Sequence, residues 1–204
     1  MSRSIEARAG FILAGFLLLE GAWALLNFLL NPMVFLRFMG FAPGLLGAPL
    51  GWIVAGLVTA LFVYHSARMP SVRANLVTIS WLKLLSLPMA LAAGLLEEAV
   101  FRKALMDSLQ HAGYGIALQV LASGLAFGAA HGVWGIFGRN WRAAVGATVA
   151  TGILGSLLAL AYVAGGRSVA CCVTAHFVMD ALCEPGLVLA VLRGEMGRSL
   201  TAVA

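Results

Sequence analysis

Residues 97–102, Glu97-Glu98-Ala99-Val100-Phe101-Arg102, place three ionisable side chains inside a stretch, Pro88 to Gln110, whose other residues are mostly apolar. The stretch is long enough to cross a bilayer as a helix, which takes about 20 residues. A charged residue near the centre of such a helix costs about 2.5 to 3.5 kcal/mol on the insertion scale, so these residues are usually retained for function. The segment therefore predicts a polar site inside a membrane.

Two further apolar stretches each carry a histidine away from their ends. His131 lies in the stretch from Tyr114 to Phe137, and His176 lies in the stretch from Ser168 to Leu192. Ionisable residues within membrane helices usually face the interior of the bundle and pair with one another. Three helices with such residues predict one shared polar site.

The composition is typical of a membrane protein. Hydrophobic residues make up 62% of the 204 residues and charged residues 10%, against about 45 to 50% and 25% in soluble domains. The net charge of +5 comes from Lys and Arg residues scattered over short loops. Because no basic stripe or aromatic-interleaved patch is present, the sequence does not indicate nucleic-acid binding.

Six apolar segments predict an all-α polytopic membrane helix bundle of about six transmembrane helices. The segments are Ala9–Leu30, Leu45–Tyr64, Pro88–Gln110, Tyr114–Phe137, Ala143–Ala164 and Ser168–Leu192. No linker or repeat separates them, so residues 1–204 are expected to form a single integral membrane domain. Leu76 to Leu87 is interpreted as an interfacial lead-in that ends at Pro88, because proline suits the start of a helix.

The charges of the loops predict the orientation in the membrane, because cytoplasmic loops collect Lys and Arg. With the N-terminus inside, Arg37 and Arg167 fall on the outer side. The inner side receives Arg3, Arg8, Arg68, Arg73, Arg139, Arg142, Arg193 and Arg198. Both termini are therefore expected in the cytoplasm, and the short loops suit a bacterial inner membrane. Ala22-Trp23-Ala24 resembles a signal-peptide cleavage site, but Glu20 interrupts the apolar run, which favours an uncleaved helix.

Helix geometry brings the polar positions to similar depths. From a turn near Ala112 and Gly113, Glu97 is about 22 Å back along one helix and His131 about 27 Å forward along the next. An antiparallel hairpin would therefore bring the two residues to within about one helical turn of each other. His176 is about 12 Å into the last helix, near mid-membrane. A site at this depth is expected to open toward the cytoplasmic half.

The spacing within helices separates supporting roles from chemical ones. Glu98 and Arg102 are four residues apart, so they share a face and can form an ion pair. Glu97 is rotated by about 100° from Glu98 and need not be neutralised by the same arginine. The last helix carries a polar stripe and a proline expected to kink it, namely His176, Asp180, Glu184 and Pro185. Gly124, Gly128 and Gly132 repeat every four residues beside His131, a pattern that lets membrane helices pack closely, within the bundle or between protomers.

Three motifs in this order resemble a known family. Residues 97–102 match its E-E-x-x-x-R motif, residues 127–131 match F-x-x-x-H, and residues 176–180 match H-x-x-x-N/D. The chain is similar to the CPBP family of intramembrane peptidases, which includes the type II CAAX prenyl endopeptidases. The resemblance covers residues 88–192, the expected peptidase core, and the first two helices contribute nothing to it.

The resemblance implies a membrane-embedded, metal-independent endopeptidase of the glutamic type, with no cofactor, that cleaves a lipidated or membrane-anchored protein. Glu97 and His131 would activate the attacking water, and His176 and Asp180 would hold the oxyanion. Glu98, Arg102 and Phe127 would support them. Asp180 departs from the commoner asparagine, and an ionised carboxylate cannot donate to an oxyanion. Asp180 is therefore expected either to be protonated or to orient His176.

Alternative functions remain open from the sequence alone. One carboxylate and two histidines are also a ligand set for catalytic zinc, although H-E-x-x-H is absent. A non-proteolytic immunity or scaffold protein could keep the same fold, and a proton-relaying transporter would use similar residues, although no inverted repeat is seen. Glu20 and Asn27 are interpreted as packing or cavity-wall residues, and Glu184 as a residue of the site or of the interface. The three cysteines are expected to be buried free thiols.

Overall fold

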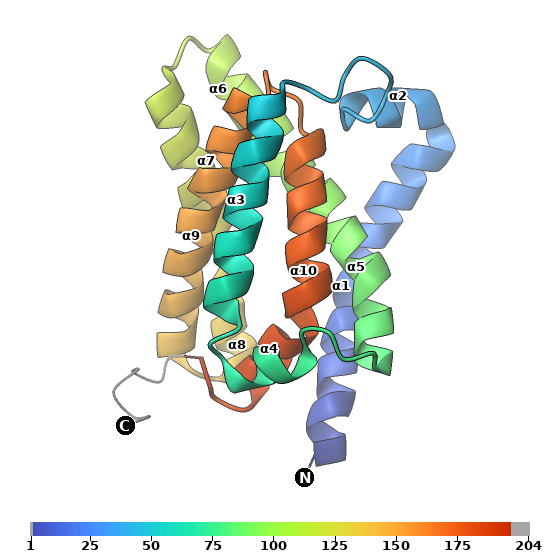
Figure 1. Cartoon of the computed structure of the whole chain (residues 1–204), viewed down its shortest axis with the longest axis vertical. Coiled ribbons are helices and arrows are strands. Elements are labelled where there is room, and N and C mark those ends of the chain that lie inside the picture. The colour runs from blue at the N-terminus through green and yellow to red at the C-terminus, as the bar shows by residue number, and fades with distance from the viewer. Residues whose placement is uncertain (1, 197–204) are drawn as a thin grey trace.

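The computed structural model describes residues 2–196, which form a bundle of helices with no strand in that range (Figure 1). In chain order the elements are α1 (Ser2–Leu30), α2 (Pro32–Phe38), α3 (Pro49–Ser66), α4 (Pro70–Asn75), α5 (Trp81–Glu98), the π-helix η1 (Ala99–Met106), α6 (Asp107–His111), α7 (Ile116–His131), α8 (Trp134–Gly138), α9 (Trp141–Ala164) and α10 (Ala170–Leu192). Six helical segments of this range are long and apolar enough to cross a membrane. The predicted fold class is confirmed.

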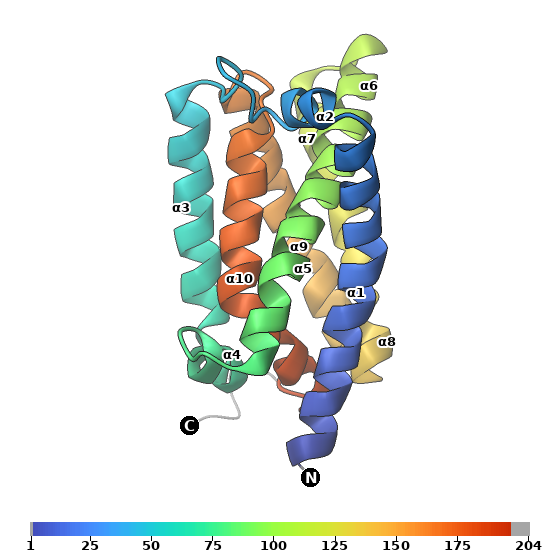
Figure 2. The same cartoon turned by 90° about the vertical axis from the view of Figure 1, so that its right-hand side faces the viewer.

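Helix α10 is the central helix of the bundle. In its apolar 18-residue section 61% of the residues are buried, against 22% to 44% in the other five membrane segments. Figures 1 and 2 show α10 with α3 on one side and α5 and α1 on the other, while α7 and α9 lie beyond it. Large apolar side chains such as Leu18, Leu57 and Leu125 point outward from the surrounding helices. A polar residue on α10 is therefore shielded from lipid.

Helix α5 begins before Pro88, so the predicted start of the third membrane segment is wrong. The hydroxyl of Ser80 accepts a hydrogen bond from the backbone N–H of Lys83 and caps the helix, which starts at Trp81. Pro88 lies inside the helix. A membrane helix tolerates an internal proline because neighbouring groups satisfy the carbonyl that loses its partner. The part of Leu76–Leu87 from Trp81 onward thus belongs to the membrane span, whereas residues 76–80 precede the helix.

Other helix ends also differ from the expected ones. The second membrane segment starts at Pro49, four residues after Leu45, because proline occupies the first turn of α3. Helix α7 ends at His131, and a turn at Gly132 and Val133 leads into the short α8. His131 is therefore the last residue of its helix and not an internal one, which leaves its side chain at an end of α7 rather than within a helical wall.

Glycines bring α7 and α9 into close contact. A Cβ atom on Gly124 would lie 2.8 Å from the carbonyl oxygen of Gly152, and one on Gly128 would collide with the carbonyl oxygen of Thr148. The predicted small-residue pattern therefore packs two helices within this bundle. This contact fixes the depth of His131 relative to α9.

The described ends of the chain, the start of α1 and the end of α10, lie at the same end of the bundle (Figure 1). Helix α1 is continuous through Ala22-Trp23-Ala24. Arg198, one of the basic residues expected on the inner side, lies outside the described residues.

Candidate active site

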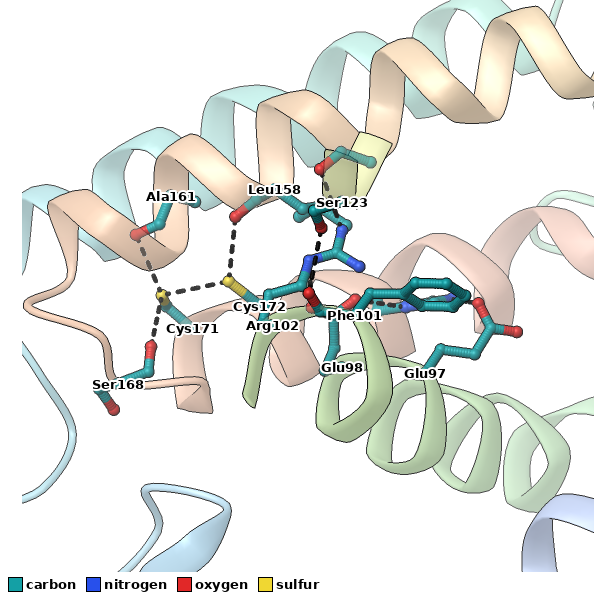
Figure 3. A network of polar contacts seen from close by, with 12 residues as sticks. Glu97, Glu98, Phe101, Arg102, Ser123, Leu158, Ala161, Ser168, Cys171 and Cys172 are labelled. Carbon is teal, nitrogen blue, oxygen red and sulfur yellow. Dashed lines mark hydrogen bonds and ion pairs between the residues drawn. The ribbon is translucent and has the colours of Figure 1, made fainter. Parts of the chain in front are cut away.

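Glu98 and Arg102 form the predicted ion pair at the junction of α5 and η1. The Nε atom of Arg102 lies 3.0 Å from Oε2 of Glu98, and both side chains are fully buried. The guanidinium also donates to the carbonyl oxygen of Gly155 on α9 at 3.2 Å and lies 4.9 Å from the ring centre of Phe127 on α7. Figure 3 shows Arg102 directed toward α9. The arginine therefore joins three helices around one buried carboxylate.

Glu98 also holds His176, which the sequence did not indicate. Its Oε1 atom lies 2.9 Å from Nδ1 of His176. A carboxylate paired with arginine can only accept hydrogen bonds, so the Nδ1 atom of His176 carries the proton. The imidazole is 95% buried and is oriented by Glu98, and its Nε2 atom faces the other polar groups of the site.

Glu97 points away from Arg102, as the rotation of about 100° per residue requires (Figure 3). Its Oε2 atom lies 3.8 Å from Nε2 of His131 and 3.8 Å from Nε2 of His176. Both distances exceed those of direct hydrogen bonds. Oε2 is buried and has no hydrogen-bond partner among the described residues. This carboxylate therefore faces two imidazoles and remains available to a third molecule.

Phe127 holds His131 in two ways. The Nδ1 atom of His131 lies 2.9 Å from the backbone oxygen of Phe127, and the two rings are stacked with centroids 4.5 Å apart. A carbonyl oxygen only accepts, so Nδ1 carries a proton, and Nε2 is the ring nitrogen that faces Glu97. Phe127 is thus more than a wall of the site, because it fixes the tautomer of the histidine.

Asp180 lies one helical turn from His176 on α10. Its Oδ2 atom is 3.4 Å from Nε2 of His176, longer than a well-formed hydrogen bond. The two nitrogens of His176 therefore face carboxylates on opposite sides, with Glu98 at Nδ1 and Asp180 at Nε2.

Two more carboxylates face this group, from α1 and from the next turn of α10. Glu20 is 93% buried, and its Oε2 atom has no hydrogen-bond partner in the described part of the chain. It interacts electrostatically with Glu97, Asp180 and His176, and Glu184 interacts with Glu20, Glu97 and Asp180. Glu184 follows Asp180 by one turn of the same helix. Asn27 donates to the backbone oxygen of Trp23 within its own helix.

Lys83 is a polar residue that the sequence analysis missed. Its Nζ atom donates to the carbonyl oxygens of Ala181 and Leu182 on α10, at 2.9 and 2.7 Å, and to that of Leu76 at 3.2 Å. Pro185 has no N–H, so the carbonyl of Ala181 loses its helical partner. Lys83 supplies the missing donor. A lone lysine in an apolar helix and a proline in another were the only signals in the sequence.

The described residues contain no group of three or more His, Cys, Asp or Glu side chains arranged to hold a metal ion. Cys171, Cys172 and Cys183 are buried free thiols, as expected. Cys172 points to the backbone of α9 (Figure 3) and takes no part in the carboxylate group.

The structure brings all the predicted site residues together, although their roles in catalysis stay predictions. Those expected to act on the substrate are Glu97, His131, His176 and Asp180, and those expected to support them are Glu98, Arg102 and Phe127.

The comparisons with known proteins agree with the predicted resemblance. A family model described as "Type II CAAX prenyl endopeptidase Rce1-like" matches residues 79–182. The match includes the seven predicted site residues and Lys83, while Glu20 and Glu184 lie outside it. No curated protein and no solved structure gives a significant match.

Proposed function

The chain belongs to the Rce1-like family of type II CAAX prenyl endopeptidases, and on this premise we propose that it hydrolyses a peptide bond of a lipidated or membrane-anchored protein. The family implies a protease, and the six apolar segments make the chain an integral membrane protein. The proposal concerns the mechanism and the substrate. The observation that carries it is the unpaired Oε2 atom of Glu97, which lies 3.8 Å from the Nε2 atoms of both His131 and His176.

Glu97 is the general base in this proposal. Arg102 is occupied by Glu98, so the charge of Glu97 is available to take a proton from water. His131 faces Glu97 with its Nε2 lone pair and can accept the second hydrogen of the same water. A water held by both groups would attack the carbonyl carbon of the substrate as its proton passes to Glu97. The same proton would then pass to the leaving amine as the tetrahedral intermediate collapses.

His176 stabilises the negative charge that develops on the substrate oxygen. Its Nδ1 atom already donates to Glu98, so a protonated ring presents a second N–H at Nε2 to an oxyanion. Asp180, at 3.4 Å from that nitrogen, orients the ring. We therefore assign Asp180 the orienting role rather than that of an oxyanion donor.

A lipidated substrate fits the position of the site. Large apolar side chains face outward from the helices around α10, so the acyl or prenyl chain of a substrate would lie in the lipid beside the bundle. The family name refers to prenylated proteins, and another membrane-anchored protein remains compatible with the same chemistry. We further propose that the protein lies in a bacterial inner membrane with both termini in the cytoplasm, because the loops on that side carry most of the Lys and Arg residues.

The experiment that tests the function is mass-spectrometric profiling of protein termini in membranes that lack this protein and in membranes to which it is restored. The restored forms are wild type, Glu97→Gln, and Glu6→Gln as a matched control, because Glu6 is a carboxylate of α1 outside the site. New termini with wild type and Glu6→Gln, but not with Glu97→Gln, are expected. Identical profiles at equal protein levels would favour the immunity or scaffold alternative.

A further inference from the structure

Glu20 belongs to α1 and lies at about the same height along the bundle axis as Asp180 of α10. Helices α1 and α5 run side by side from the same end of the bundle (Figure 2). Gly10 lies against Trp81 and Gly21 lies against Ala92, so facing residues of the two helices keep the same difference in residue number. By this difference Glu20 of α1 lies level with Leu91 of α5. Glu97 is six residues further along α5, or about 9 Å.

Helix α10 supplies the other acidic residues at this level. It runs in the opposite direction to α5, and Gly94 packs against His176, with a Cβ on the glycine 3.6 Å from that of the histidine. Asp180 therefore lies about 6 Å below His176, close to the level of Glu20. Glu184 follows one turn later. Ala9 and Leu13 of α1 pack in one cluster with Val188 and Leu189 of α10, which keeps the two helices adjacent.

No Lys or Arg side chain of the described residues forms an ion pair with Glu20, Asp180 or Glu184. Glu20 and Glu184 interact electrostatically with each other, with Asp180 and with Glu97. Arg102 pairs with Glu98, and the Nζ atom of Lys83 donates to three backbone carbonyls rather than to a carboxylate. His176 is the basic side chain of the described residues that lies beside this group, with its Nε2 atom 3.4 Å from Oδ2 of Asp180.

A buried carboxylate with no hydrogen-bond partner is costly unless a ligand or a proton satisfies it. The side chain of Glu20 is 93% buried, and its Oε2 atom has no described partner. A long basic side chain satisfies the charge and keeps its apolar stem along the helix walls. The separation of about 9 Å between the level of Glu20 and that of Glu97 corresponds to fewer than three residues of extended chain, at about 3.3 Å each.

We propose that Glu20, Asp180 and Glu184 form an acidic subsite that binds a lysine or arginine side chain of the substrate within three residues of the scissile bond. This inference rests on the proposed endopeptidase function and extends it to the substrate class. Glu20 is then a specificity-determining residue from a helix outside the matched family region.

The test uses palmitoylated, fluorescent peptides in proteoliposomes of the full chain. Each peptide carries one lysine, or the uncharged norleucine, at a defined position, and binding to the Glu97→Gln protein is measured separately from cleavage by the wild type. Lysine at one position is expected to improve both binding and kcat/KM about tenfold or more, as for a buried charge pair. Glu20→Gln is expected to remove this preference and leave the norleucine peptide unaffected, whereas the control Glu6→Gln retains the preference.

Three results would overturn the inference. The first is that the Glu97→Gln protein binds the lysine and norleucine peptides equally well. This comparison leaves Glu20 in place. The second is an unchanged lysine preference in Glu20→Gln, and the third is an equal loss for both peptides, which would make Glu20 a general support of Asp180. Lysine-selective binding without any cleavage by wild type would sustain the subsite and contradict the proposed function instead.

Discussion

Replacement of Arg102 by methionine is predicted to cost about 3 to 5 kcal/mol of unfolding free energy, as is usual when one partner of a buried ion pair is removed. The arginine side chain is fully buried and forms the 3.0 Å ion pair with Glu98. It also donates to Gly155 and lies over the ring of Phe127. Methionine fills a similar volume, so the loss is electrostatic rather than a cavity.

The double variant Glu98→Gln/Arg102→Met separates this effect from a general loss of packing. It leaves no unpaired charge, and the remaining penalty is about 1 to 3 kcal/mol for the carbonyl of Gly155 that has lost its donor. The double variant is therefore expected to be more stable than Arg102→Met alone. The matched control is Arg37→Met, an exposed arginine of α2, with a change within about 0.5 kcal/mol.

Reversible unfolding in mixed micelles, followed by circular dichroism as the fraction of denaturing detergent rises, measures these differences. A cost below about 1 kcal/mol for Arg102→Met would refute the reasoning, because it would mean that the buried carboxylate does not need the arginine. A double variant whose loss equals the sum of the two single losses would also refute it, since independent effects imply no coupling between the pair.

Four more outcomes are expected. Glu97→Gln and His131→Ala are expected to lower kcat about 100-fold or more without a matching loss of stability. Single-turnover cleavage measures the first effect and thermal unfolding the second. Turnover near that of the wild type in the folded variants would contradict this prediction. Metal chelators leave cleavage unchanged and elemental analysis finds no stoichiometric zinc, whereas a loss restored by zinc would support the zinc mechanism. Lys83→Met is expected to lower the free energy of unfolding by about 1 to 3 kcal/mol for each carbonyl of α10 that is left unsatisfied. Lys83→Arg, which keeps a donor, is expected to lower it less in the same unfolding assay. Equal losses for the two variants would rule out the donor role. Gly128→Ala is expected to lower the yield of folded protein, because the added Cβ meets the backbone of α9. The control Gly146→Ala, whose Cβ would enter open space, is expected to leave the yield unchanged. A normal yield for both variants would contradict the packing argument.

The parts of the site that follow from helix geometry were predictable from the sequence. The hairpin estimate brought Glu97 and His131 to the same depth, and their side-chain atoms lie 3.8 Å apart. The spacing of four residues gave the ion pair of Glu98 and Arg102. Both inferences succeed because the rise and rotation per residue of a helix are nearly constant.

Contacts that depend on a second helix were not predictable. No partner for Lys83 could be predicted from the sequence, because its acceptors are backbone carbonyls of other segments, among them that of Ala181, which Pro185 leaves without a helical donor. The start of α5 was misplaced for a related reason. Proline favours the first turn of a helix, yet the Ser80 cap lies upstream and the bundle tolerates Pro88 inside the span.

The two adjacent glutamates, Glu97 and Glu98, have different roles in the proposed site. Glu98 contacts both Arg102 and His176, so any change at Glu98 alters the stability of the bundle and the orientation of the imidazole together. Glu97 contributes no ion pair to the fold and leaves Oε2 unpaired beside two histidines. Its burial without a fixed cation is a cost that the rest of the bundle must offset. Neutralising Glu97 should therefore leave the fold as stable as before or more so, and this sign distinguishes a chemical role for Glu97 from a structural one.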